Sequence, residues 1–176
     1  MELVFEKGRA QDIEEIGRLY DDLCDYLSAH VNYPGWIKGF YPTLDTAAEG
    51  VRTDTLFIAK CNDTIVGTVI LNGIPETGYE SANWAITTTD YSDVFVMHTL
   101  AVHPDYLKYG VGRFLLQSGI DYAKNHGFRA LRLDVNDQNE PAMRLYEALG
   151  FQYVGTVDLG LGKYGLDWFK LYELVL

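Results

Sequence analysis

The sequence predicts an α/β fold with a mixed sheet, and two observations lead to this prediction. Apolar patterns follow one another in the order strand, two helices, three strands, helix, strand, helix and two strands. The chain has 176 residues, of which 48% are hydrophobic, so it is long and apolar enough to bury the core of one domain. No repeat, low-complexity tract or interdomain linker is visible, and we therefore expect residues 1–176 to form a single domain.

A short apolar strand at residues 3–5 opens the chain, and a helix follows it. Asp12, with Glu15 three positions later, fits a capping box, in which side chains satisfy the free backbone N–H groups of the first helical turn. From Ile13 to Leu27, apolar side chains recur at helical spacing. We therefore expect one face of this helix to lie in the core.

Aromatic side chains gather in the next segment, residues 30–42, although two prolines and two glycines interrupt regular structure there. Tyr33, Trp36, Phe40 and Tyr41 present more apolar surface than a solvated loop normally carries. The sequence leaves two interpretations open. The segment packs as a structural lid, or it forms the wall of a ligand pocket.

A second, short helix and two strands come next. Thr43 is a suitable N-cap for a helix that ends near Arg52. Residues 55–61 and 64–71 have the composition of strands and are joined by an Asn-Asp turn, which predicts a hairpin. The connection that follows, residues 72–93, is polar with a few aromatic side chains. A loop this long inside a compact domain is usually functional or mobile.

The central stretch combines an apolar strand at residues 94–102, a loop that contains Gly110 and Gly112, and a helix from about Gly110. The first turn of a helix has unpaired N–H groups and a partly positive end, so a phosphate group can bind there if no side chain blocks its approach. The two glycines remove that obstruction. The pair alone is a weak signal, because neither a Walker loop nor a complete dinucleotide motif is present.

Four more elements complete the predicted order. A strand at residues 130–135 is followed by a short helix at residues 139–149. A strand at residues 151–157 leads through a glycine-rich loop to a final strand at residues 166–175, where apolar and polar side chains alternate.

Three central segments occur in a characteristic order and spacing: HTLAVHP at residues 98–104, YGVGR at residues 109–113 and NEPAMRLYEALGF at residues 139–151. Together they closely resemble the GNAT superfamily of acyl-CoA N-acyltransferases. The resemblance implies a single GNAT-like α/β domain, whose mixed, mostly antiparallel sheet is flanked by helices, and acetyl-CoA as co-substrate. It does not identify the acceptor.

The resemblance also implies which residues bind coenzyme A. The backbone of Leu100, Ala101 and Val102 would pair with the pantetheine arm, and Asn139 would contact the cofactor as well. One departure from the family pattern is Leu107, where relatives usually have Arg or Gln, so one polar contact is lost. The residues that would wrap the pyrophosphate are Lys108, Tyr109, Gly110, Val111, Gly112 and Arg113.

Acetyl transfer to an amine needs a base, because an amine with a pKa near 10.4 is mostly protonated at pH 7. His98 resembles a proton-relay histidine of serotonin-type arylalkylamine N-acetyltransferases, although Val96 replaces their second histidine. Asp134 aligns with the acidic base of bacterial ribosomal-protein N-terminal acetyltransferases. Each has a structural alternative: His98 as a hydrogen-bonded core residue, and Asp134 as a carboxylate that faces Arg132 or a helix end.

The leaving thiolate must be stabilised or protonated, and Tyr146 occupies the position of the family's "LYE" tyrosine, whose hydroxyl lies near the sulfur in many members. A purely packing role on the apolar helix face is the alternative. The four histidines have no metal-ligand spacing, so we expect no metal. A nucleophile elbow is absent too, which favours direct attack in a ternary complex over a covalent acyl-enzyme.

Composition excludes several classes of partner. The net charge of −11 argues against nucleic acid, and no apolar run is long enough to span a membrane. Cys24 and Cys61 are expected as free thiols, which fits a reducing cytoplasm, and the N-terminal segment does not resemble a signal peptide.

We therefore predict a cytoplasmic acetyl-CoA-dependent N-acetyltransferase that modifies a primary amine of a small molecule, with a homodimer as a possible assembly. Trp36, Tyr41 and Trp84 are the expected acceptor-binding residues. The acidic charge and the aromatic loops, which also contain Tyr79, would suit a cationic or aryl amine. Two alternatives stay open: a protein N-terminal or lysine acetyltransferase, and a CoA-binding module without turnover.

Overall fold

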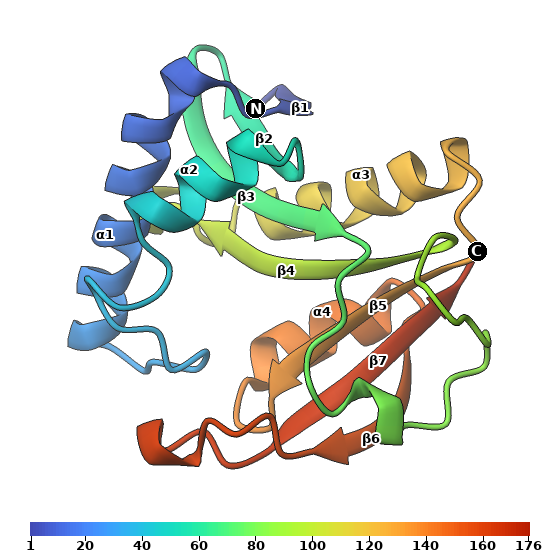
Figure 1. Cartoon of the computed structure of the whole chain (residues 1–176). Helices are drawn as coiled ribbons and strands as arrows, with labels where there is room; N and C mark the ends of the chain where they lie inside the picture. Colours follow the sequence, from blue (N-terminus) through green and yellow to red (C-terminus); the bar gives the residue numbers. More distant parts are fainter. The chain divides into compact units, whose positions relative to one another are not determined.

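The computed structural model describes residues 1–176 and contains the elements in the order that the apolar patterns predict (Figure 1). The strands are β1 (Leu3–Lys7), β2 (Leu56–Cys61), β3 (Thr64–Asn72), β4 (Val94–Val102), β5 (Ala130–Asn136), β6 (Gln152–Val157) and β7 (Phe169–Val175). The α-helices are α1 (Ile13–Ala29), α2 (Leu44–Arg52), α3 (Val111–Asn125) and α4 (Glu140–Ala148).

The strands form one seven-stranded sheet in the order β1-β2-β3-β4-β5-β7-β6. The pairs β1–β2, β2–β3, β5–β7 and β6–β7 are antiparallel, whereas β4 and β5 are parallel. The predicted α/β class with a mixed, mostly antiparallel sheet is therefore confirmed.

The chain divides into two compact units that share β4 and α3. The first unit contains residues 1–32, 36–71 and 98–119, and the second contains residues 33–35, 72–97 and 120–176. Each unit supplies one group of candidate functional residues. That residues 1–176 form a single domain stays a prediction.

In the first unit, helices cover both faces of β3. Thr68 is fully buried, and its hydroxyl lies 3.1 Å from the Tyr20 hydroxyl of α1. Successive side chains of a strand point to opposite faces, so Gly67 faces the other way. A Cβ added at Gly67 would lie 2.8 Å from Leu115 of α3 and 2.9 Å from the carbonyl oxygen of Ala101. Glycine therefore lets the first turns of α3 pack tightly against β3.

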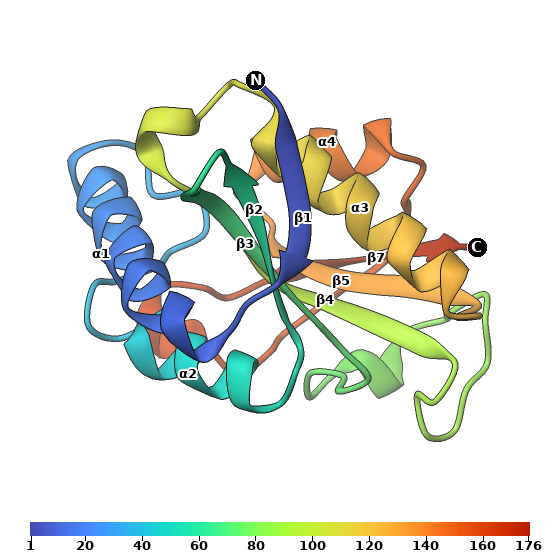
Figure 2. The same ribbon diagram turned by 90° about the horizontal axis from the view of Figure 1, so that it is seen from above.

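Helices α1 and α2 also pack closely and lie side by side (Figure 2). A Cβ at Gly17 of α1 would come within 2.6 Å of Leu44, the first residue of α2. The core beneath them is apolar on the face that the helical spacing predicts. Its buried residues in α1 are Ile16, Leu19, Tyr20, Leu23 and Leu27.

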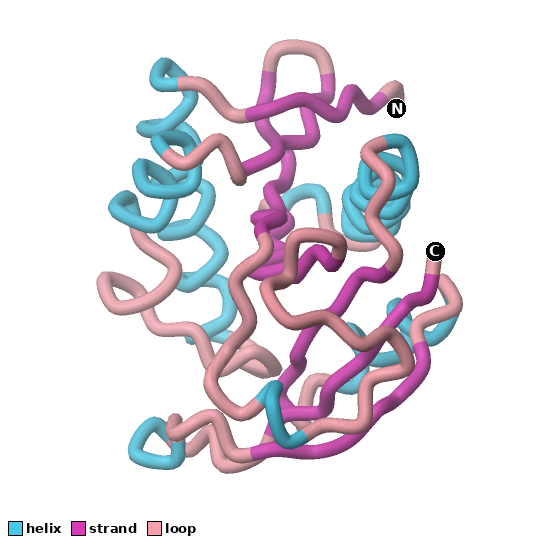
Figure 3. The backbone as a smooth tube through the Cα atoms, turned by 45° about the vertical axis from the view of Figure 1, so that its right-hand side comes forward, coloured by secondary structure: helices cyan, strands magenta, loops and turns pink.

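In the second unit, β5 pairs with β7 over its whole length, from Ala130 opposite Val175 to Asn136 opposite Phe169. The connection between β3 and β4 is a loop interrupted by one short helical turn at Tyr79–Ser81 (Figure 3). None of the helices in either unit has the length and hydropathy needed to cross a membrane.

Two local predictions were wrong. Asp12 and Glu15 do not form a capping box on α1: Asp12 accepts a hydrogen bond from the Arg9 N–H at 2.8 Å, and Glu15 accepts one from the Ile65 N–H at 2.8 Å. The last strand begins at Phe169 instead of Leu166, because Leu166 forms an isolated bridge in the preceding loop. The cap of α2 is confirmed, since the Thr43 hydroxyl accepts from the Thr46 N–H.

Candidate active site

The end of β4 departs from regular strand geometry at Thr99. This buried residue has a φ of +48°, which is uncommon for a β-branched side chain and typically marks a bulge or a functional site. The Tyr41 hydroxyl makes a hydrogen bond to the Thr99 hydroxyl, which ties the aromatic segment to this point of β4. The pairing of β4 with β5 covers Val94–Val96, so Thr99 lies beyond the paired stretch.

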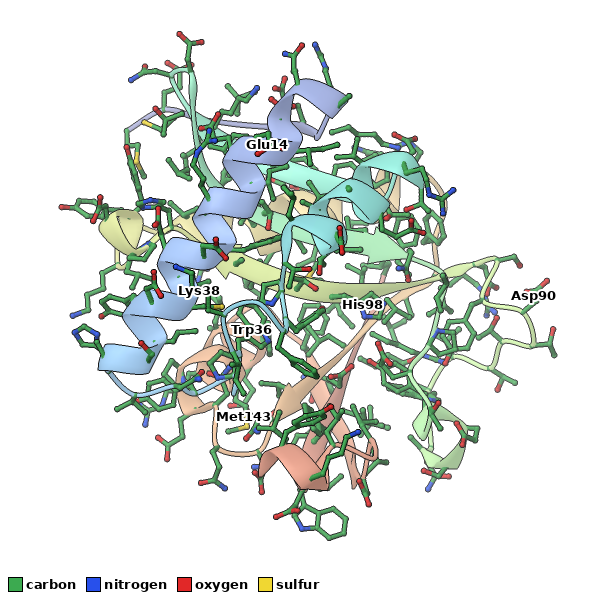
Figure 4. All side chains as sticks on the ribbon, turned by 60° about the vertical axis from the view of Figure 1, so that its left-hand side comes forward. Glu14, Trp36, Lys38, Asp90, His98 and Met143 are labelled. Carbon is green, nitrogen blue, oxygen red and sulfur yellow. The ribbon has the colours of Figure 1, made fainter.

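The predicted pantetheine-binding residues follow Thr99 on β4. Leu100 and Val102 are half-buried, and the Ala101 side chain is only 1% exposed. The candidate base His98 immediately precedes Thr99 on β4 and is half-buried (Figure 4). Thr99, with its positive φ, therefore lies between the candidate base and the predicted pantetheine-binding residues of β4.

The predicted pyrophosphate loop places an open backbone before α3. Lys108 has a φ of +68° and Gly110 a φ of +83°, and no atom lies within 4 Å of a Cβ added at Gly110. The first N–H group to enter the helical ladder is that of Phe114, which donates to the Gly110 carbonyl at 2.9 Å. The backbone N–H groups of Val111, Gly112 and Arg113, which precede Phe114 in the first turn of α3, are thus the free donors that an anion needs.

Charges around this loop also suit an anion. The side chains of Lys108 and Arg113 are exposed, and neither forms an ion pair within the protein. Val111 is buried and anchors the helix start. Tyr109 is 69% exposed beside the open backbone. Leu107 adds no polar group, so the two cations are the charged groups available to a pyrophosphate. The loop therefore fits the group that the sequence predicts.

In the second unit, Asp134 and Tyr146 are brought close enough to interact electrostatically. Asp134 is half-buried on β5, and Tyr146 of α4 is 8% exposed. Burial raises the pKa of the Tyr146 phenol, and the Asp134 carboxylate raises that pKa further. The Tyr146 ring also packs against Phe151 and Tyr172, with centroid separations of 6.0 and 6.2 Å. Its hydroxyl therefore stays protonated, as a donor must.

Asp134 does not pair with Arg132, which was one structural alternative for it. Arg132 instead binds Glu173 at 3.1 Å, and both side chains are 2% exposed. The Asp134 carboxylate accepts a hydrogen bond of 2.8 Å from the hydroxyl of Tyr79. Tyr79 is a contact that the sequence pattern did not predict, because it lies in an irregular connection and pairs with a residue 55 positions away.

The remaining predicted residues occupy defined places. Asn139 is the N-cap of α4, where its side chain accepts from the Ala142 N–H at 3.3 Å. Trp36 packs against the core of the first unit and meets the Tyr41 ring edge-on. Trp84 is turned inward, since its indole N–H donates to the Tyr79 carbonyl at 2.7 Å. Acceptor binding by these aromatic residues stays a prediction.

The aromatic segment is more exposed than the sequence suggests. Phe40 is 57% and Tyr41 39% exposed, whereas Trp36 is half-buried. Trp36 is therefore the more deeply packed residue, while Tyr41 contacts it edge-on and is held at Thr99 by its hydroxyl.

Comparison with known proteins agrees with this arrangement. The sequence pattern of the acetyltransferase (GNAT) family matches residues 17–151, which is most of the chain. The chain belongs to the GNAT acetyltransferase family. The family uses acetyl-CoA, and the strand, loop and helix described above lie within the matched part of this GNAT protein.

Two curated relatives illustrate how far the similarity reaches. An uncharacterised N-acetyltransferase of Methanocaldococcus jannaschii is 30% identical over 139 residues, which are 75% of this chain and 57% of the relative. The ribosomal protein bS18 alanine N-acetyltransferase of Escherichia coli K12 is 42% identical over 59 residues, or 34% of this chain and 40% of that enzyme. The chain thus spans about half the length of these relatives.

Solved structures share the fold over nearly the whole chain. A GNAT-family acetyltransferase of Streptococcus agalactiae superposes with a TM-score of 0.82 at 15% identity, covering 99% of this chain and 95% of that one. A candidate acetyltransferase of Salmonella typhimurium, solved with its cofactor acetyl-CoA, superposes with a TM-score of 0.69 at 17% identity, covering 99% and 94%. At these identities the likeness supports the fold alone.

Proposed function

We propose that this protein transfers an acetyl group from acetyl-CoA to a primary amine of a small molecule, by direct attack in a ternary complex. The observation that carries the proposal is that one unit contains both a hydrogen-bonded carboxylate, Asp134, and the buried phenol of Tyr146, whose pKa burial and the Asp134 charge raise. A carboxylate can accept the proton of an ammonium group, and a neutral phenol can donate to a thiolate. Asp134 can thus take the proton of the amine, and Tyr146 can stabilise the leaving thiolate by a hydrogen bond.

Binding of acetyl-CoA would use the strand–loop–helix group of the first unit. The pyrophosphate would accept hydrogen bonds from the free amides near Gly110 and Gly112, while Lys108 and Arg113 neutralise its charge. The backbone of Leu100–Val102 would pair with the pantetheine arm in the manner of an added strand. Leu107 contributes no hydrogen bond, so we expect these other contacts to provide the affinity.

Amine activation is the costly step, since freeing the lone pair of an amine with a pKa near 10.4 at pH 7 costs about 4–5 kcal/mol. We assign the base to Asp134, which has a hydrogen-bonded carboxylate and shares its unit with Tyr146. The ammonium group gives one proton to this carboxylate, and the freed nitrogen forms the new C–N bond as the C–S bond breaks. The second proton released by the nitrogen is taken up by the departing thiolate, which leaves as a thiol. His98 is the alternative base, because an imidazole titrates near neutral pH.

Tyr146 would act on the leaving sulfur mainly as a hydrogen-bond donor. Its raised pKa means that the phenol gives up its proton less readily than a free tyrosine does. A thiol has a pKa near 8.5, so complete proton transfer from this phenol to the thiolate is unfavourable at rest. A charge-assisted hydrogen bond to the thiolate is the contribution that this environment favours.

A second candidate function is acetylation of a protein N-terminus. The 42% identity with the ribosomal protein bS18 alanine N-acetyltransferase, although limited to 59 residues, is the observation that favours it. Both functions use the same acetyl donor and differ only in the acceptor. A module that binds acetyl-CoA without turnover is the remaining alternative.

The test is release of free thiol from acetyl-CoA with a panel of polyamines, aryl amines, amino acids and peptides that begin with alanine. The wild type would be compared with Asp134→Asn and His98→Ala. We expect turnover on one class of small amine, with a loss of at least about 100-fold in Asp134→Asn and less than about tenfold in His98→Ala. Turnover on the peptides alone would favour the second function. Tight acetyl-CoA binding without any turnover would refute both.

A further inference from the structure

Tyr79 has no role in the reaction proposed above, yet it is among the most buried aromatic residues. It begins the short helical turn in the connection between β3 and β4, and it is 1% exposed. Its hydroxyl donates a hydrogen bond of 2.8 Å to Oδ2 of Asp134. The connection between β3 and β4 thus brings a buried phenol into hydrogen-bond contact with the candidate base.

Neighbouring groups hold Tyr79 in place. The indole N–H of Trp84 donates to the Tyr79 carbonyl at 2.7 Å, and the centroids of the two rings are 5.2 Å apart. Arg132 lies over the Trp84 ring at 4.2 Å and pairs with Glu173. Glu173 in turn accepts the Ala85 N–H at 2.7 Å, which fixes the loop backbone just after Trp84. The connection is therefore anchored around the tyrosine by buried polar contacts.

We propose that Tyr79 is a positioning residue whose phenol holds the Asp134 carboxylate in the orientation and the ionised state that amine activation requires. The inference rests on the proposed function, with Asp134 as the base. The carboxylate of Asp134, a residue within β5, can rotate about its side-chain bonds, and a hydrogen bond to one oxygen fixes that rotation. A neutral donor also favours the charged over the protonated carboxyl group.

The charges around Asp134 are consistent with this role. Burial raises the pKa of Tyr79, as does the Asp134 carboxylate, so the phenol acts only as a donor. Tyr146 faces Asp134 from α4. Arg132 on β5 and Glu173 on β7 neutralise each other, and Glu76 adds a carboxylate from the connection. From the connection between β3 and β4, Tyr79 thus supplies Asp134 with an uncharged hydrogen-bond donor.

The experiment compares two loop variants that each lose one phenol hydroxyl. Tyr79→Phe removes the donor to Asp134. Tyr91→Phe is the matched control, because the Tyr91 hydroxyl accepts from Arg132 at 2.7 Å. Two readouts would be collected for wild type and both variants: the titration of the Asp134 side-chain carbon by NMR in the free protein, and the pH dependence of kcat/KM on the preferred amine.

We expect Tyr79→Phe to move the Asp134 titration and the acid limb of kcat/KM upward together by about one pH unit. The plateau of kcat/KM should fall about tenfold, because the carboxylate loses its fixed orientation. In Tyr91→Phe both midpoints should stay within about 0.2 pH units of wild type. The melting temperatures of Tyr79→Phe and Tyr91→Phe would be compared, and we expect similar values, so that a difference in kinetics does not reflect a difference in folding.

Failure of this inference can be told apart from failure of the proposed function. Turnover by wild type with an unmoved Asp134 titration in Tyr79→Phe would overturn the positioning role alone. A moved NMR titration with an unchanged acid limb would also overturn it, since Asp134 would then not be the base. Absence of turnover in wild type would refute the proposed function itself.

Discussion

Arg132 and Glu173 form an ion pair of 3.1 Å in which both side chains are almost fully buried. The Arg132 guanidinium also donates to the Tyr91 hydroxyl and to the Ile86 carbonyl. Glu173 accepts backbone N–H groups of the same loop. The pair therefore links β5 and β7 to the connection that carries Tyr79, and every charge in it has a partner.

Glu173→Gln should lower the free energy of unfolding by about 3–5 kcal/mol, because it leaves the Arg132 charge buried without compensation. Urea unfolding followed by circular dichroism measures the change. The control is Glu140→Gln in α4, which breaks an exposed ion pair with Arg144 and should cost less than about 1 kcal/mol. Equal effects of the two substitutions would contradict the prediction.

The order of elements could be predicted from the sequence because its signals are local. Strand periodicity, the Thr43 and Asn139 caps and the glycines before α3 all act within a few residues, and the structure has each of them in place. The same locality explains why the sequence alone is enough to predict where the open loop before α3 lies.

Contacts between distant residues could not be predicted. Asp12 and Glu15 have capping-box spacing, but Glu15 bonds instead to Ile65, 50 positions away. Asp134 could have faced Arg132 two positions earlier, but a tyrosine from an irregular loop binds it instead. Such partners depend on how elements pack, and no short-range pattern in the chain encodes that packing.

Tyr146→Phe should lower kcat about 100-fold while leaving the KM for acetyl-CoA within about twofold, because it removes the donor to the leaving sulfur and little of the packing. Steady-state kinetics by thiol release measures both constants. The neighbouring Tyr172→Phe is the control: its hydroxyl donates to Glu147 at 2.9 Å, away from Asp134. A similar loss of kcat in both variants would point to a packing role for Tyr146.

Buried tyrosines should make the protein unstable in alkali. Burial and the hydrogen bond to Glu147 raise the pKa of Tyr172 to about 12, and burial also raises the pKa of Tyr20, Tyr79 and Tyr146. The unfolded phenols have pKa values near 10, so above that pH the unfolded chain loses protons that the folded chain keeps. The stability that Tyr172 contributes is present below about pH 10 and is lost between about pH 10 and about pH 12.

Urea unfolding between about pH 9 and about pH 11.5 tests this linkage. The free energy of unfolding should fall with a slope of up to about 1.4 kcal/mol per pH unit for each such tyrosine. Tyr172→Phe should reduce this slope by up to about 1.4 kcal/mol per pH unit relative to wild type, which is the contribution of one proton. Parallel curves for the two proteins would mean that Tyr172 ionises equally in the folded and unfolded chains.

Gly110→Ala should weaken acetyl-CoA binding about tenfold. The φ of +83° at this position is unfavourable for alanine, and the added methyl group would stand at the open backbone before α3 where the pyrophosphate is expected. Gly127→Ala is a close control, because Gly127 follows the other end of α3 with a φ of +78° and also has no atom within 4 Å of an added Cβ.

Both substitutions should therefore lower the stability by a similar amount, about 1 kcal/mol, through backbone strain alone. Only Gly110→Ala should raise the Kd of acetyl-CoA measured by calorimetry. If Gly127→Ala weakened binding equally, the effect would come from strain in α3. If neither changed the Kd, the pyrophosphate would bind away from the start of this helix.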